Sequence, residues 1–160
     1  MLIRAVSEDD MPQIMDLWNA MIRDTTATFT TLEKTKADLN ALRADRQDAF
    51  LVAEVQGRIA GFVTWGPFRS GPGYAQTAEH TIITAEPRQG VGRALMDAAM
   101  TQAKRQGLHV MIGGISGENP SAIAFHQRLG FAMAGQLSQV GRKNGRWLDL
   151  ILMSKPIEAR

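Results

Sequence analysis

The sequence predicts one mixed α/β domain with a sheet of about seven strands. Its 160 residues suit a single domain with a sizeable core. Short β-branched or alternating runs are interleaved with stretches of helical period, in the order β-α-α-β-β-β-α-β-α-β-β. Turn residues separate these stretches, and hairpin signals occur toward both ends. We therefore expect residues 1–160 to form one domain with antiparallel hairpins at both flanks.

The first half of this pattern contains two helices and four strands. Ser7 and Pro12 mark the start of the first helix, and Leu39 and Leu42 face inward from the second. The predicted strands are 2–6, 50–55, 58–65 and 74–84, the second helix is about 34–46, and polar or glycine-rich loops occupy 24–31 and 66–73.

The second half is bounded by clearer signals. A helix beginning at Val91 ends at Gly107, and Asn119 with Pro120 starts another that Gly130 closes. A strand is expected over 109–113, and the last two strands, 131–141 and 146–153, form a hairpin about Asn144-Gly145.

The turn after residue 84 has the form of a phosphate site. The run Thr81–Thr84 favours a strand, Glu86-Pro87 ends it, and Gly90 and Gly92 precede the helix. Glycines allow positive φ or close approach of a ligand, and a helix N-terminus offers unpaired N–H groups to an anion. An ordinary strand-to-helix turn is the alternative, because such short motifs also occur by chance.

Composition excludes several classes of protein. The chain has no cysteine, and its three histidines lack metal-ligand spacing, so we expect no metal site. No apolar run is long enough to span a bilayer, and the N-terminus reads as a strand, which makes the cytoplasm the expected compartment and a membrane partner unexpected. A net charge of +2 without a basic block argues against nucleic acid.

The motifs together resemble the GNAT superfamily of N-acetyltransferases. Arg88–Leu95 is similar to its pyrophosphate loop, and Asn119–Phe131 to its Asn-capped helix that ends in Leu-Gly-Phe. The segments 25–29, 79–81, 107–111, 126–131 and 139–150 resemble one branch, the phosphinothricin and methionine sulfone or sulfoximine acetyltransferases. The glycine turn is about two residues shorter than that branch usually shows, and Ala75 stands where a second loop arginine is usual.

The resemblance implies how acetyl-CoA is held. Helices cover both faces of a strongly twisted sheet, and the fourth and fifth strands splay apart so that pantetheine can enter between them. Main-chain groups of Ile82, Ile83 and Thr84 would bind pantetheine, with the Ile83 N–H donating to the acetyl oxygen. The remaining cofactor residues would be Arg88, Gln89, Gly90, Val91, Gly92, Arg93 and Asn119, although helix capping alone explains Asn119.

Two residues are candidates for proton transfer. Glu79 shares a strand face with Thr81, so it could take a proton from the amine, unless it is a plain surface glutamate. The resemblance implies that His126 protonates the leaving thiolate, whereas a packed helix histidine is the alternative. His80 faces away from Glu79, and we expect it to be structural.

The acceptor site is expected to involve Arg69, Phe29 and Tyr74, together with Glu79. An arginine fork binds a carboxylate or phosphinate, and the two aromatic rings would pack on a short apolar stem. The resemblance places Lys143–Trp147 near both the acceptor and a subunit interface, which implies a homodimer.

The leading hypothesis is therefore acetyl transfer from acetyl-CoA to the α-amine of a small amino acid or analogue, by direct attack in a ternary complex. The analogues implied are phosphinothricin, methionine sulfone and methionine sulfoximine. The alternatives are an acetyltransferase for another amine, either a polyamine or a protein N-terminus, and a non-catalytic acyl-CoA sensor.

Overall fold

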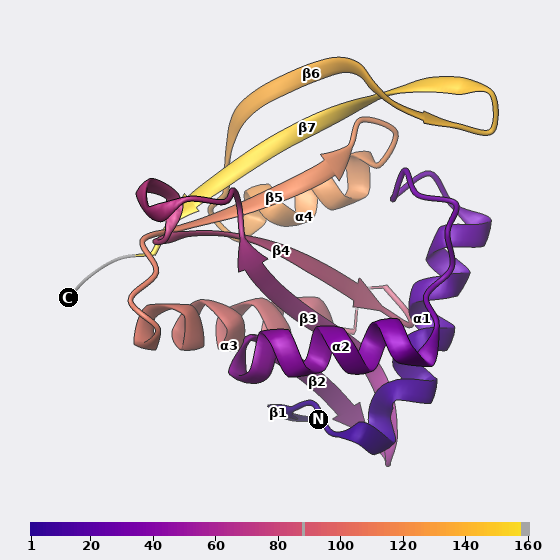
Figure 1. Ribbon diagram of the computed structural model, residues 1–160, viewed down its shortest axis with the longest axis vertical. Helices are drawn as coiled ribbons and strands as arrows, with labels where there is room; N and C mark the ends of the chain where they lie inside the picture. The colour runs from indigo at the N-terminus through magenta and orange to yellow at the C-terminus, as the bar shows by residue number, and fades with distance from the viewer. Residues whose placement is uncertain (88, 158–160) are drawn as a thin grey trace.

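A seven-stranded mixed sheet organises the chain, in the order β1-β2-β3-β4-β5-β7-β6 (Figure 1). The computed structural model describes residues 1–87 and 89–157. The strands are β1 (Leu2–Ala5), β2 (Phe50–Val55), β3 (Arg58–Pro67), β4 (Thr77–Thr84), β5 (Val110–Ser116), β6 (Ala132–Lys143) and β7 (Arg146–Pro156). The main helices are α1 (Met11–Asp24), α2 (Lys36–Arg46), α3 (Val91–Arg105) and α4 (Pro120–Arg128).

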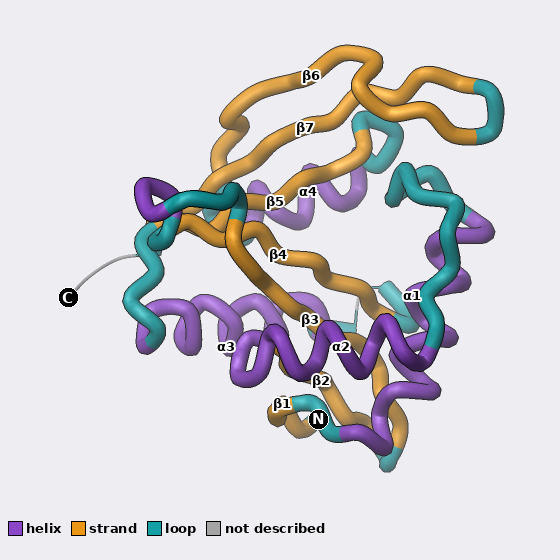
Figure 2. Tube along the Cα trace, viewed as in Figure 1, coloured by secondary structure: helices purple, strands orange, loops and turns teal. Residues whose placement is uncertain are grey.

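Helices cover both faces of the sheet, as expected (Figures 1 and 2). One core lies between the sheet and α1 and α2, and includes Ile14, Leu39 and Phe62. The other core lies under α3 and α4, and includes Leu95 and Met153. All these side chains are shielded from water, so hydrophobic burial on two faces holds the layers together.

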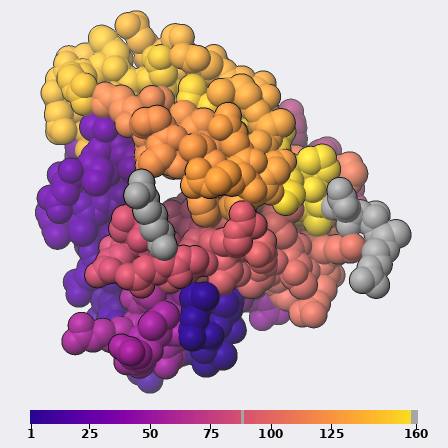
Figure 3. Space-filling view, turned by 180° about the vertical axis from the view of Figure 1, so that it is seen from behind, coloured from indigo at the N-terminus to yellow at the C-terminus, as the bar shows by residue number. Residues whose placement is uncertain are grey.

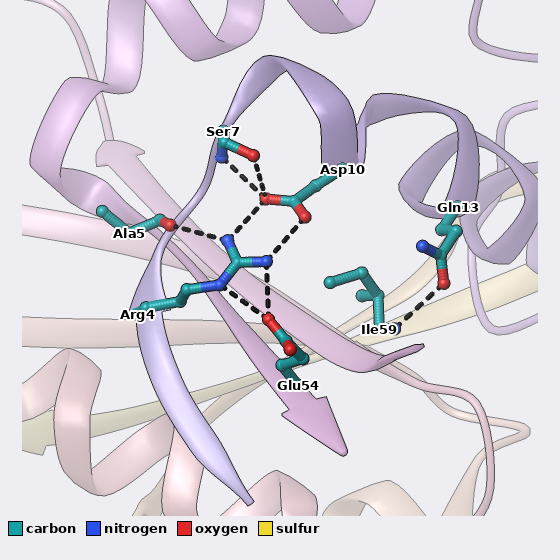
Figure 4. A network of polar contacts seen from close by, with 7 residues as sticks. All are labelled: Arg4, Ala5, Ser7, Asp10, Gln13, Glu54 and Ile59. Atoms are coloured by element: carbon teal, nitrogen blue, oxygen red, sulfur yellow. Dashed lines mark hydrogen bonds and ion pairs between the residues drawn. The ribbon is translucent and has the colours of Figure 1, made fainter. Parts of the chain in front are cut away.

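A partly buried ion network fixes the start of the chain (Figure 4). The Arg4 guanidinium donates to both oxygens of Asp10 at 2.8 Å and to Glu54 at 2.9 Å. This arginine holds the pKa of the Asp10 carboxyl below its usual range. Asp10 also accepts from the main chain and hydroxyl of Ser7, so the network ties β1, the entry to α1, and β2 into one unit.

Several strand and helix boundaries differ from the sequence prediction by a few residues, and two of these differences have a local cause. Helix α2 begins at Lys36 because the Thr35 hydroxyl accepts from the Asp38 N–H while the Asp38 carboxylate accepts from Thr35, a reciprocal cap. Strand β4 begins at Thr77 because Pro72–Tyr74 forms a short 3-10 turn. The final hairpin turns at Asn144-Gly145 as predicted, and both residues have positive φ.

The two central strands part midway along their length. β4 and β5 run parallel and pair only from Thr77 opposite Val110 to His80 opposite Gly113. Beyond His80, β4 stays paired with β3 as far as Thr84, whereas β5 continues beside β7. The expected splay of these strands is therefore confirmed.

Among the residues described, no helix is both long and apolar enough to cross a membrane.

Candidate active site

The pocket of about 930 Å³ lies where β4 and β5 separate. Residues of β4 and β5, the starts of α3 and α4, and the end of α1 with its following loop line it. In the space-filling view the molecule is hollowed between the violet N-terminal segment, the orange α4 region and the rose α3 region (Figure 3). Predicted site residues from distant parts of the sequence, Phe29, Glu79, Gly90 and His126 among them, meet in this one pocket.

The main chain of β4 decides which residues can bind a guest strand. The Phe68 N–H donates to the Thr77 carbonyl and the Ala85 N–H to the Ala60 carbonyl, both on the β3 side. The register between β3 and β4 is continuous, so odd-numbered residues of β4 direct their N–H and C=O groups toward β3. The main-chain groups of the even-numbered residues point toward β5 and, beyond His80, into the gap.

This pattern corrects one expectation about the cofactor. The main-chain groups of Ile83 point to β3, and its side chain is buried in the core under α1 and α2. The N–H and C=O groups of Ile82 and Thr84 face the gap instead, and both residues line the pocket. Residue numbers alone do not reveal the hydrogen-bonding phase of a strand, which explains the error.

The α3 N-terminus forms the far end of the pocket. Gly90 has φ +77°, a left-handed conformation that suits glycine. The first N–H bonded within this helix belongs to Ala94, so the N–H groups of Val91, Gly92 and Arg93 have no partner among the described residues. Such groups favour an anion at the positive end of the helix dipole.

Gly92 allows close packing at this end. A Cβ on Gly92 would lie 3.1 Å from the Phe125 ring of α4, so that ring would have to shift by a few tenths of an ångström to admit a side chain. Gln89 and Arg93 line the pocket mouth, and the Gln89 amide donates to the Glu86 carboxylate. Arg88, the other predicted phosphate contact, lies outside the described residues.

Glu79 directs its carboxylate into the pocket. Its side chain leans across β5, and a Cβ on Gly114 would lie only 2.7 Å from Glu79 Oε1. Glu79 is still accessible to solvent, but partial burial raises the pKa of its carboxyl. A carboxylate with a raised pKa at a pocket wall is suited to accept a proton.

His80, whose side chain points to the face of β4 opposite to Glu79, forms a buried pair with His126 of α4. Their Nε2 atoms are 2.9 Å apart, and the rings stack with centroids 5.1 Å apart. His126 Nδ1 lies 2.7 Å from the Ala122 carbonyl, which can only accept, so Nδ1 carries the proton. Neutral His126 therefore accepts at Nε2 from His80.

This protonation state affects the expected role of His126 as the general acid. Burial lowers the pKa of His126, and burial together with the neighbouring His126 lowers that of His80 to about 3. Both rings are consequently neutral at neutral pH. His126 lines the pocket as expected, but its one proton is held by Ala122, and sequence reasoning missed that His80 is its partner.

Asn119 begins α4 as predicted. Its side-chain oxygen accepts from the Ala122 N–H at 3.1 Å and from the Ser121 hydroxyl at 2.9 Å. The oxygen is committed to the cap, so only the amide nitrogen of Asn119 is left to contact a ligand in the pocket.

The acceptor end differs from expectation in two places. Phe29 lines the pocket and lies so close over Gly141 that no side chain fits there. Arg69 and Tyr74 do not line this pocket: both are exposed on the β3–β4 connection, where Tyr74 packs edge-on against Phe68. Residues Pro72–Tyr74 of this connection form a turn of 3-10 helix, which the glycine and proline content did not reveal.

Three other residues at the acceptor end were not predicted. Lys34, Trp18 and Met21 line the pocket beside Phe29 and Glu79. The sequence offered no signal for Lys34, since a lysine before a polar helix is usually a solvated residue. Trp18 belongs to the core beside α1 and also faces the cavity.

The fold and this pocket define an enzyme of the acyl-CoA-dependent transferase type. A family model described as the acetyltransferase (GNAT) domain matches residues 3–152. The chain belongs to this GNAT family and is an N-acetyltransferase, a class that uses acetyl-CoA as its acetyl donor.

Named relatives cover nearly the whole chain. It is 36% identical to the L-methionine sulfoximine/L-methionine sulfone acetyltransferase of Pseudomonas aeruginosa, with 94% of this chain and 91% of that protein covered. It is 31% identical to the phosphinothricin N-acetyltransferase of Alcaligenes faecalis, over 98% and 83% of the two chains.

Solved structures share the fold. The phosphinothricin acetyltransferase of Sinorhizobium meliloti in complex with acetyl-CoA superposes with a TM-score of 0.91 at 26% identity, covering 97% and 87% of the chains. The ribosomal-protein-alanine N-acetyltransferase of Brucella melitensis gives 0.93 at 33% identity, covering 98% and 99%.

Proposed function

We propose that this enzyme transfers the acetyl group of acetyl-CoA to the α-amine of a small amino acid or analogue, by direct attack in a ternary complex. Methionine sulfone, methionine sulfoximine and phosphinothricin are the acceptors proposed first, because relatives that match nearly the whole chain carry their names. The observation that carries the proposal is one pocket with the Glu79 carboxylate at one wall and the unpaired edge of β4 at another.

The donor would lie along this edge of β4. Ile82 and Thr84 supply main-chain groups for pantetheine, and the N–H groups of Val91, Gly92 and Arg93 hold the pyrophosphate. We propose that an N–H of Ile82 or Thr84 donates to the acetyl oxygen as it becomes an oxyanion. Loss of one such donor costs about 3–4 kcal/mol in other enzymes.

Glu79 would act as the general base. The amine nitrogen attacks the thioester carbon, Glu79 accepts the proton from nitrogen, and the carbon–sulfur bond then breaks to release CoA thiolate. His126 is the predicted donor to that thiolate. It must first take a second proton from solvent at Nε2, in place of the His80 contact, because its Nδ1 proton is held by Ala122. A His126→Gln variant tests this role.

Acceptor-dependent CoA release tests the function. Wild-type enzyme should release CoA with at least one of the three proposed acceptors. Glu79→Gln should lower kcat by roughly 100-fold or more, while calorimetry shows unchanged acetyl-CoA affinity. Gly114→Ala should lower kcat about 10-fold, since its new methyl group displaces the Glu79 carboxylate and not the main chain.

Gly135→Ala is the matched control, because a Cβ there meets no atom within 4 Å. Glu79→Gln with wild-type turnover would show that Glu79 is not the base. A folded wild type that binds acetyl-CoA but is silent with every amine would favour the sensor alternative.

A protein N-terminus is the second candidate acceptor. The structural relative from Brucella melitensis is named for ribosomal-protein alanine, so an alanine-terminated peptide belongs in the same panel. A peptide turned over faster than the amino acids would replace the leading proposal.

We also propose that the enzyme is a homodimer. Met133, Leu137, Val140 and Trp147 on the β6–β7 hairpin are between 44% and 58% exposed. Large apolar side chains gathered on one exposed hairpin are typical of interaction surfaces.

A further inference from the structure

The acceptor half of the pocket contains one cationic side chain among the residues described. Lys34 lies there with Trp18, Phe29 and Glu79. The other described cations of the lining, Arg93 and Arg128, come from α3 and the end of α4, near the phosphate turn. A cation and the Glu79 carboxylate thus share the space where the amine substrate must lie.

The main chain of Lys34 is held in place by a buried side chain. The Asn19 amide of α1 donates to the Lys34 carbonyl at 2.9 Å, and its oxygen accepts from the Lys34 N–H at 2.7 Å. Asn19 is only 8% exposed, so this two-point contact is sheltered from water. The lysine stem therefore starts from a fixed position although it belongs to a loop.

The ammonium group rests on an aromatic ring. Lys34 Nζ lies 5.1 Å from the centre of the Trp18 ring, which is within the range of a cation–π contact. The Trp18 ring is itself fixed by the Phe62 ring beneath it, at a centroid distance of 5.1 Å. This contact orients the ammonium group without neutralising its charge.

The neighbouring carboxylates are engaged elsewhere. Glu33 pairs with Arg23. Asp38 is bound by Thr35, which lowers the pKa of Asp38, and the Lys34 charge adds a smaller effect in the same direction. Lys34 makes no ion pair within the part of the chain that the structure describes, so its charge remains available to a ligand.

We propose that Lys34 determines acceptor specificity by pairing with the α-carboxylate of the amino acid substrate. This inference rests on the proposed function. A free amino acid carries an amine and a carboxylate on one carbon, which suits a site with Glu79 on one side and Lys34 on the other. Lys34 thereby takes the role that was predicted for Arg69, which does not line the pocket.

The same charge disfavours the other amines. A polyamine places a second cation near Lys34, and like charges repel. A peptide N-terminus carries a neutral amide where the free amino acid carries its carboxylate, so it gains nothing from Lys34.

Two substrates and two variants test the inference. Methionine sulfone is compared with its α-carboxamide, which keeps the amine and the side chain but lacks the negative charge. Lys34→Gln should raise KM for methionine sulfone about 10- to 100-fold, the usual effect of losing a charge-assisted hydrogen bond. Its effect on the carboxamide should be at most about 3-fold, and Lys34→Arg should restore most of the discrimination.

Lys36→Gln is the matched control, because it removes the same charge from the exposed first residue of α2, which does not line the pocket. The KM for acetyl-CoA should be unchanged in all three variants. Equal effects of Lys34→Gln on acid and amide, or equal effects of Lys36→Gln and Lys34→Gln, overturn the role of Lys34 alone. A wild type inactive with every acceptor overturns the proposed function, and this inference with it.

Discussion

At the scale of residues, neighbours on β4 have opposite surroundings. Glu79 is accessible in the acceptor pocket, whereas His80 is 7% exposed and contacts His126 and Phe131. His80 Nδ1 is buried without a hydrogen-bond partner of good geometry among the described residues, although the Ile112 main chain slightly raises the pKa of the ring. A buried neutral pair of this kind makes folding sensitive to acid.

The free energy of unfolding should fall as the pH drops below about 6.5. Burial lowers the pKa of folded His80 to about 3, so in this range the unfolded chain binds a proton that the folded chain does not. At pH 5 this costs the wild type roughly 2 kcal/mol relative to pH 7.5. His80→Gln should show a shallower loss in urea titrations at the two pH values.

His109→Gln serves as the control, since His109 is exposed and lies directly before the first residue of β5. That variant should follow the wild-type pH dependence. Identical slopes for His80→Gln and wild type would mean that the pair does not titrate on unfolding.

Single residues were predicted unevenly, for physical reasons. Glu79 and His126 follow from motifs whose strand or helix phase places them toward the cleft, and both line it. Lys34 enters the pocket only because Asn19 holds a loop against α1, a contact between residues 15 apart that no period encodes. Arg69 lies outside the pocket lining, on a loop whose path no local pattern in the sequence predicts.

At the scale of elements, a single lysine joins the last hairpin to the acceptor loop. Lys143 of β6 is 4% exposed, and its Nζ donates to the carbonyls of Ile22, Thr25 and Thr28 at 2.7–2.9 Å. These carbonyls lie at the end of α1 and in the loop that carries Phe29. The cation suits the negative end of the helix dipole.

Lys143→Met should therefore destabilise the protein and disturb the acceptor site. One buried and two partly buried carbonyls lose their donor, which should cost roughly 2–4 kcal/mol in urea unfolding. KM for the acceptor should rise while acetyl-CoA affinity persists, because the loop supplies Phe29 to the pocket and none of the residues of the phosphate turn. Lys104→Met, on the exposed side of α3, should change neither. Unchanged stability of Lys143→Met would contradict the tethering role.

Elements with local signals were predicted well. The α4 start at Pro120 and the hairpin turn at Asn144-Gly145 depend on capping and on positive φ, which the residues themselves require. The start of β4 and the partners of its edge depend on strand pairing across the sheet. The sequence prediction therefore started β4 too early, at Tyr74, and assigned the main chain of Ile83 to the wrong side of the strand.

At the scale of the whole molecule, we predict a dimer through the β6–β7 hairpin. Light scattering on the wild type at micromolar concentration should give twice the chain mass of 17.5 kDa. Trp147, with Arg142 stacked 4.4 Å above its ring, is the largest apolar group exposed there. Trp147→Glu should shift the mass toward one chain, whereas Leu32→Glu, an exposed residue outside the hairpin, should not. A wild-type mass of one chain would exclude the dimer.

The overall architecture followed from the order of elements, and the resemblance implied the gap, but the residue at which the gap opens needed three-dimensional information. Four residue pairs join β4 to β5, and the sheet opens where that pairing stops. The sequence of neither strand shows at which residue its pairing with the other strand ends.

One strand thus serves two reactants by different means. The proposed donor contacts on β4 come from the peptide backbone, which point mutations leave in place, whereas the proposed acceptor contacts come from the side chains of Glu79 and Lys34. Substitutions can therefore redirect such an enzyme toward new amines during evolution without eroding its use of a universal thioester. Enzymes with this fold are therefore expected to differ more in the amine that they accept than in their use of acetyl-CoA.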